Sequence, residues 1–154
     1  MMSLSSEVIS RLAGKNLVTA ESLTGGGIGN VLTSVPGASL IYKGGIISYV
    51  NDVKRDVLGV PQEILDSYGA VSSCTAGFMA SGVRKLLKAD IAVSVTGLAG
   101  PGGDEFGHPV GTVYIGYDSN SKSLVKEFHF FGTREEVRKQ TIEAALELIL
   151  EQNS

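Results

Sequence analysis

The residues best suited to chemistry in this sequence lie in a glycine-rich stretch near its start. Residues 16–27 read NLVTAESLTGGG, a short apolar run followed by Ser22 and a glycine cluster. We expect a strand that passes through a tight turn into a helix, which leaves backbone N–H groups and the positive helix end exposed. Such a turn can bind an anion. A hydroxyl beside oriented N–H groups also builds an acyl-transfer nucleophile with its oxyanion hole, so Ser22 is either a nucleophile or a helix N-cap.

A serine nucleophile needs a base, and the sequence offers two kinds. His108 falls in a glycine-rich loop and His129 in an alternating strand, where a surface role is favoured, so a Ser-His-Asp triad has little support. A lysine can serve instead when burial or a neighbouring cation lowers its pKa. Lys54, five residues after Tyr49, is the candidate base, and a solvated surface lysine is the alternative.

A second glycine-rich loop, residues 96–103 (TGLAGPGG), follows the apolar run at 89–95. Ligands of open α/β sheets bind beyond the carboxyl ends of the strands, so we expect residues 19–27 and 96–103 to meet over one crevice. Neither loop is a known nucleotide motif, because no Walker lysine follows the first and GGGIGN fails the G-x-G-x-x-G pattern. An anion site and plain tight turns therefore both fit these loops.

Two arginines near the end of the chain could bind a phosphate. Arg134 and Arg138 are one helical turn apart and share a face, so they either clamp an anion or pair with Glu135. Their spacing does not separate these two roles.

Composition predicts one domain, residues 1–154, with an ordinary hydrophobic core, since 43% of residues are hydrophobic and 19% are charged. The net charge of -3 gives no reason to expect nucleic acid as a partner. The single Cys74 excludes an intrachain disulfide and a cysteine-based zinc site, and it fits a reducing compartment. With no leader at Met1 and no apolar run of membrane-spanning length, we expect a cytoplasmic domain with no membrane partner.

Helical and strand patterns are interspersed along the chain. Strands are predicted at 17–20, 45–50, 89–95, 110–117 and 124–131, and helices at 4–13, 26–34, 51–58, 61–68, 72–88 and from 132 or 133 onward. The last two strands are joined by a polar turn and should be antiparallel. This pattern predicts an α/β fold, a three-layer α/β/α sandwich with a mixed, mostly parallel sheet.

Five segments occur in the order seen in the CinA C-terminal domain family. They are residues 19–26 (TAESLTGG), 45–54 (GIISYVNDVK), 69–72 (GAVS), 95–101 (VTGLAGP) and 109–112 (PVGT). The sequence resembles this family over nearly its whole length, and the best-known activity of the family is nicotinamide-nucleotide amidase. The resemblance implies hydrolysis of the carboxamide of nicotinamide mononucleotide to nicotinic acid mononucleotide and ammonia, in pyridine nucleotide salvage, without a metal or other cofactor.

The resemblance also assigns roles to the matching residues. Ser22 corresponds to the nucleophile and Lys54 to the base that activates it. Tyr49 corresponds to a hydroxyl that supports proton transfer, and Thr96 to a polar contact at the reacting centre. Amide hydrolysis by this pair requires a neutral lysine, so Lys54 must be desolvated or lie near another cation.

Substrate contacts are expected around these four residues. An arginine of the last helix completes the site of the family, and Arg134 and Arg138 both fit that position. The other expected contacts are Glu21, Thr24, Gly25, Gly26, Gly45, Asn51, Gly97, Ala99 and Gly100. The N–H groups of residues 24–26 are the expected oxyanion donors, and Glu21 either orients Lys54 or, as we favour, caps the glycine turn.

The sequence departs from the family pattern in two ways. Leu23 stands where the family commonly has cysteine, a change that we expect to affect packing more than chemistry. Many relatives carry a second domain related to molybdopterin-binding proteins, which this sequence lacks, so we do not expect its activity here.

Two other functions remain open, because some family members share the fold without amidase activity. One is a non-catalytic nucleotide-binding module with a regulatory role around DNA uptake, and the other is an amidase for a different small amide. The resemblance also suggests a homo-oligomer, with the strand at 110–117 at its interface.

Overall fold

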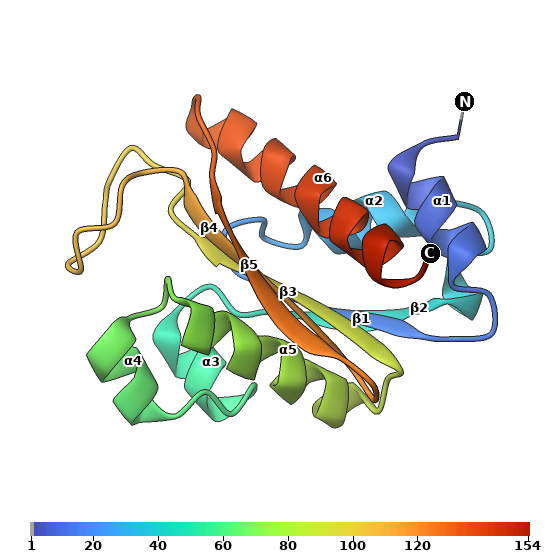
Figure 1. Ribbon diagram of the computed structural model, residues 1–154, viewed down its shortest axis with the longest axis horizontal. Helices are drawn as coiled ribbons and strands as arrows, with labels where there is room; N and C mark the ends of the chain where they lie inside the picture. The colour runs from blue at the N-terminus through green and yellow to red at the C-terminus, as the bar shows by residue number, and fades with distance from the viewer. Residues whose placement is uncertain (1) are drawn as a thin grey trace.

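A five-stranded sheet lies between two layers of helices in the computed structural model, which describes residues 2–154 (Figure 1). The strands are β1 (Leu17–Glu21), β2 (Tyr42–Ile47), β3 (Ile91–Gly97), β4 (Thr112–Ser119) and β5 (Ser123–His129). The helices are α1 (Leu4–Arg11), α2 (Gly27–Thr33), α3 (Asn51–Asp56), α4 (Gln62–Tyr68), α5 (Ser73–Leu87) and α6 (Arg134–Gln152), with a short 3-10 helix, η1, at Ala38–Leu40. Within residues 2–154, no helix is both long enough and apolar enough to cross a membrane.

The sheet is mixed, in the order β2-β1-β3-β4-β5. Strand β1 pairs in parallel with β2 and β3, whereas β4 pairs antiparallel with β3 and β5. Strand β4 is therefore the only one of the five described strands that runs against the others. The predicted fold class, a three-layer α/β/α sandwich with a mixed, mostly parallel sheet, is confirmed.

The two faces of the sheet bury different kinds of side chain. Helices α1, α2 and α6 cover one face, where Val93 and Val95 of β3 enter a large aliphatic core. Helices α3, α4 and α5 lie on the other face, where Ala92 packs with Met79 and Val83 of α5. Helix α5 lies close to the sheet because β4 has a glycine under it: a Cβ on Gly116 would lie 2.7 Å from the Ala76 carbonyl oxygen.

Capping residues define the ends of the long helices as the sequence predicts. The Ser72 hydroxyl accepts a hydrogen bond from the Thr75 N–H and begins α5. Thr133 and Glu136 form a capping box at the start of α6. Both long helices therefore begin where the sequence places them.

Three expectations about the strands and helices were wrong in detail. Strand β2 spans 42–47 rather than 45–50, because its extent is set by pairing with β1, and Tyr49 lies beyond its end. Strand β4 spans 112–119 rather than 110–117, and it lies inside the sheet with Val113 and Ile115 in the core. The apolar spacing along the helix at 72–88 also predicts that Leu86 is buried, but it is 48% exposed.

Candidate active site

A cavity of about 660 Å³ opens at the carboxyl ends of β1 and β3. Ser22 and Leu23 of the first glycine-rich stretch and residues 96–103 of the second line it, so the two segments meet over one crevice. Nine of the predicted site residues line the cavity: Ser22, Tyr49, Asn51, Lys54, Thr96, Gly97, Ala99, Gly100 and Arg134. Six others do not line it: Glu21, Thr24, Gly25, Gly26, Gly45 and Arg138.

Ser22 and Lys54 are in direct contact at the base of the cavity. Ser22 follows β1 and Lys54 lies on α3, and Lys54 Nζ is 3.1 Å from Ser22 Oγ. The same nitrogen donates to the carbonyl oxygens of Ser48 at 2.7 Å and Tyr49 at 3.4 Å. A neutral amine has two N–H groups and one lone pair. With both N–H groups on carbonyl oxygens, the lone pair of the neutral form is left for the Ser22 hydroxyl proton.

The environment of Lys54 favours this neutral form. Its side chain is 1% exposed, and no carboxylate of residues 2–154 lies within 4 Å of its nitrogen. Burial removes water from the ammonium group and lowers the pKa of Lys54 from 10.5 to about 8. A lysine with this pKa can act as a general base near neutral pH.

The turn after Ser22 contains its own anion. The Glu21 carboxylate accepts hydrogen bonds from the Thr24 hydroxyl (2.6 Å) and from the N–H groups of Ile28 (2.8 Å) and Gly29 (3.0 Å). It therefore occupies the N-terminus of α2, where the sequence predicted a site for an external anion. Glu21 is 2% exposed and does not line the cavity, so the structure places it at the helix end, as its alternative role as a cap requires.

Arg138 holds the same turn from the opposite end of the chain. Its Nε donates to the Leu23 carbonyl oxygen at 2.8 Å and its Nη2 to the Thr24 carbonyl oxygen at 3.2 Å. The backbone itself turns at Gly25 and Gly26, whose φ angles of +58° and +100° favour glycine. Arg138 is thus a clamp on this turn and does not line the cavity. Residues 24–26, whose N–H groups were the expected oxyanion donors, do not line the cavity either.

Gly45 is a packing residue. A Cβ at this position of β2 would lie 2.7 Å from the Tyr42 hydroxyl oxygen and 2.9 Å from the Thr19 carbonyl oxygen. The glycine is needed for close packing between β1, β2 and Tyr42. It does not line the cavity, where a substrate contact was predicted.

Arg134 joins three segments at the cavity wall. Its Nη1 donates to the Gly100 carbonyl oxygen at 2.7 Å, and its Nη2 donates to the Tyr49 hydroxyl at 2.9 Å. The Tyr49 side chain is 58% exposed, and only its backbone carbonyl contacts Lys54. The structure therefore places the Tyr49 hydroxyl beside the arginine rather than beside the Ser22–Lys54 pair.

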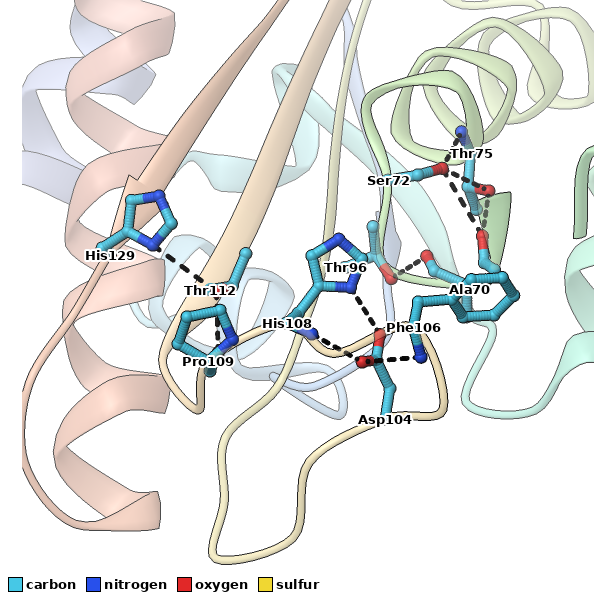
Figure 2. A network of polar contacts seen from close by, with 11 residues as sticks. Ala70, Ser72, Thr75, Thr96, Asp104, Phe106, His108, Pro109, Thr112 and His129 are labelled. Atoms are coloured by element: carbon cyan, nitrogen blue, oxygen red, sulfur yellow. Dashed lines mark hydrogen bonds and ion pairs between the residues drawn. The ribbon is translucent and has the colours of Figure 1, made fainter. Parts of the chain in front are cut away.

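The far wall of the cavity is a network of polar contacts (Figure 2). Thr96 at the end of β3 donates to the Ala70 carbonyl oxygen at 2.7 Å, which ties the sheet to the α4–α5 connection. In the loop 98–111, Asp104 Oδ2 lies 2.6 Å from His108 Nδ1, and Asp104 Oδ1 accepts from the Phe106 N–H. Ser22 makes its side-chain contact with Lys54, not with His108, so a Ser-His-Asp triad is not formed.

His129 has the surface position that was expected. It ends β5, its side chain is 53% exposed, and its Nε2 is 2.5 Å from Glu127. No cluster of three or more His, Cys, Asp or Glu side chains suited to a metal ion occurs in residues 2–154.

Comparisons with known proteins identify the family of this chain. The family profile described as the CinA C-terminal domain matches residues 1–153. This chain belongs to the CinA C-terminal domain family. Its relatives include a "CinA-like protein" of Endomicrobium trichonymphae, 46% identical over 135 residues that cover 88% of this chain and 32% of the relative. The CinA domain described here therefore spans about a third of the length of the curated relatives that it matches.

Solved structures of the family have the same fold as this CinA domain. The competence/damage inducible protein CihA from Agrobacterium tumefaciens is 39% identical with a TM-score of 0.94, and 98% of this chain covers 94% of that one. The CinA superfamily protein from Enterobacter cloacae is 30% identical with a TM-score of 0.95, and 100% of this chain covers 94% of that one.

Sequence reasoning missed several groups that shape the site of this CinA domain. The Ser48 carbonyl that accepts from Lys54, the Ala70 carbonyl that accepts from Thr96 and the Phe106 ring were not singled out. Backbone carbonyls carry no sequence signal. Phe106 does carry one, since an aromatic residue within the glycine-rich run 97–107 stands out from its neighbours.

Proposed function

We propose that this CinA domain hydrolyses the carboxamide of nicotinamide mononucleotide to nicotinic acid mononucleotide and ammonia. The observation that carries the proposal is the 3.1 Å contact between Ser22 Oγ and the buried Lys54 Nζ. A serine is a weak nucleophile until a base takes its proton, and a desolvated lysine beside it supplies that base. The specific substrate comes from the resemblance of the chain to amidases of its family.

In the first step, Ser22 Oγ attacks the amide carbon while its proton passes to the Lys54 lone pair. The resulting tetrahedral intermediate carries its negative charge on the former carbonyl oxygen. Leu23 lines the cavity and its N–H has no acceptor within residues 2–154, so we assign this N–H as an oxyanion donor. Lys54 then gives the proton to the departing nitrogen, ammonia leaves, and an ester joins Ser22 to the acyl group.

The second half of the reaction regenerates the serine. Lys54, again neutral, takes a proton from water, and the hydroxide equivalent attacks the ester carbon. Collapse of the second tetrahedral intermediate returns the proton from Lys54 to Ser22 Oγ and releases the carboxylic acid. The Ser48 and Tyr49 carbonyls hold the lysine nitrogen in place throughout.

The shape and charge of the cavity fit a small nucleotide. Its volume of about 660 Å³ lies within the range of small-molecule sites. Arg134 lines the wall with a guanidinium that binds phosphate well, because its N–H groups match the oxygens of that group. We assign it as the partner of the substrate phosphate.

Ammonia release by the purified protein tests the proposal. We expect the wild type to release ammonia from nicotinamide mononucleotide, and Ser22→Ala and Lys54→Met each to lose activity by about a hundredfold or more. Matched controls are Ser34→Ala and Lys43→Met, which change an exposed serine and an exposed lysine. Undiminished turnover in Ser22→Ala would exclude this nucleophile. Saturable binding of the mononucleotide without product would instead support a nucleotide-binding module.

A further inference from the structure

The loop 98–111 presents one aromatic ring to the cavity, that of Phe106. The side chain lines the cavity and remains 39% exposed, although an apolar ring gains free energy when it is buried. Neither the nucleophile, the base nor the arginine of the proposed reaction uses it. Its position at the wall suggests that a ligand covers it.

The structure holds this ring in place from two sides. Phe106 packs directly on the backbone of the α4–α5 connection, where a Cβ on Gly69 would lie 2.6 Å from the ring. The Phe106 N–H and the His108 N–H both donate to Asp104 Oδ1, at 3.2 Å and 3.0 Å, so the loop carries its own brace (Figure 2). A ring that is fixed before binding loses little conformational entropy on contact with a ligand.

Charge is distributed unevenly around the cavity. The two basic side chains that line it, Lys54 and Arg134, belong to α3 and α6. The two anions that line it, Asp104 and Glu105, directly precede Phe106 on the loop. Glu105 makes no ion pair with any side chain of residues 2–154. The loop end of the cavity therefore offers an aromatic face beside negative charge, which suits a cation, and the α6 end suits an anion.

From this arrangement we infer that Phe106 is a specificity-determining residue that stacks on a flat, positively charged ring of the substrate. The inference rests on the proposed function, whose substrate carries the reacting carboxamide on a pyridinium ring. Such a ring is flat and positively charged. The quadrupole of the Phe106 ring attracts a cation over its face, and the adjacent carboxylates add to the attraction. A neutral ring of the same size receives only the packing contribution.

Two ligands that differ in this charge and in one N-methyl group test the inference. 1-Methylnicotinamide is a pyridinium cation and nicotinamide is neutral, and both carry the same carboxamide and no phosphate. Their Kd values can be measured by chemical-shift titration of the Ser22→Ala protein, which prevents hydrolysis during the experiment. We expect the cation to bind about tenfold more tightly than the neutral ligand. Phe106→Leu in the same background should remove this preference, and Phe106→Tyr should keep it.

Phe131→Leu is the matched control, because this phenylalanine is 86% exposed and does not line the cavity. It should leave both Kd values unchanged. Equal Kd values for the two ligands, or no binding of the cation at millimolar concentration, would overturn the inference. A preference that survives Phe106→Leu would also overturn it. So would an equal loss of affinity for both ligands in Phe106→Leu, because a residue that only packs the loop would weaken both equally.

The outcome is separate from that of the amidase proposal. If ammonia is never released but Phe106 selects the cation, the ring subsite stands without the chemistry. If ammonia is released but no preference for the cation is seen, the chemistry stands without the subsite.

Discussion

The guanidinium of Arg134 donates a 2.9 Å hydrogen bond to the hydroxyl of Tyr49, 85 residues earlier in the chain. The contact joins the start of α6 to the segment between β2 and α3 at the wall of the cavity. Arg138, one helical turn later, instead donates to the backbone carbonyls of Leu23 and Thr24. Two arginines that the sequence could not separate therefore act at different places, and we expect their substitutions to have different kinetic effects.

Replacement of Arg134 should weaken substrate binding. Arg134→Met removes a charge-assisted contact to the phosphate of the proposed substrate, which we expect to raise KM for nicotinamide mononucleotide about tenfold to a hundredfold. The KM for an amide without phosphate should change much less. Steady-state ammonia release on both substrates measures this difference. Arg11→Met, on the exposed surface of α1, is the control. Equal effects on both substrates would contradict the phosphate assignment.

The activity should rise with pH as Lys54 loses its proton. Burial lowers the pKa of Lys54 to about 8, so below this pH the protonated nitrogen has no lone pair for the Ser22 proton. We expect kcat/KM to increase through an apparent pKa near 8 and then to level off. Initial rates between about pH 6 and pH 10 measure the profile. Lys54→Arg should be inactive over this range, because arginine stays protonated. An active Lys54→Arg enzyme would contradict the role of the base.

The stability of the folded protein should rise over a higher pH range for the same reason. The pKa of Lys54 is lowered in the folded state, so between about 8 and 10.5 the unfolded chain binds a proton that the folded chain has released. The free energy of unfolding therefore increases with pH across this window, by up to about 3 kcal/mol. Urea unfolding of the wild type and Lys54→Met at several pH values isolates this contribution. Lys43→Met should follow the wild-type curve, whereas Lys54→Met should lack the rise.

Local sequence patterns predicted most strands and helices, because the residues within and next to each element determine where it forms. The run at 89–95 is apolar except for Asp90 and Ser94, as expected of a strand covered on both faces, and Ser72 and Thr133 are strong N-caps. The start of β2 could not be predicted in this way. Lys43 and Gly44 do not resemble a strand, and their extended backbone is fixed by hydrogen bonds to β1.

The site could be predicted only as far as the residue types reveal it. The meeting of the two glycine-rich loops follows from the position of each loop after a parallel strand. The burial of Lys54 does not follow from its neighbours in sequence, because α3 buries this side chain against Ser22, 32 residues away. The role of Glu21 was equally hidden, since a carboxylate at the end of a strand can face a ligand or a helix end.

Glu21 should be important for stability. Its carboxylate accepts hydrogen bonds from the Thr24 hydroxyl and two backbone N–H groups, so in Glu21→Gln the amide N–H₂ would face one or more of these donors. We expect a loss of about 2 kcal/mol in the free energy of unfolding. Urea denaturation measures it, with Glu147→Gln on the exposed face of α6 as the control. Unchanged stability would show that the carboxylate is not required as the cap of α2.

Arg138 should affect the chemical step more than substrate binding. Its two hydrogen bonds hold the carbonyls of Leu23 and Thr24, the two residues that directly follow Ser22. Loss of this clamp in Arg138→Met would loosen the backbone next to Ser22, on which the nucleophile and the proposed oxyanion donor, the Leu23 N–H, depend. We therefore expect kcat to fall about tenfold to a hundredfold while KM changes little, the reverse of the Arg134→Met pattern. Steady-state kinetics of the two variants measured side by side test this, and a rise in KM alone for Arg138→Met would place that residue with the substrate instead.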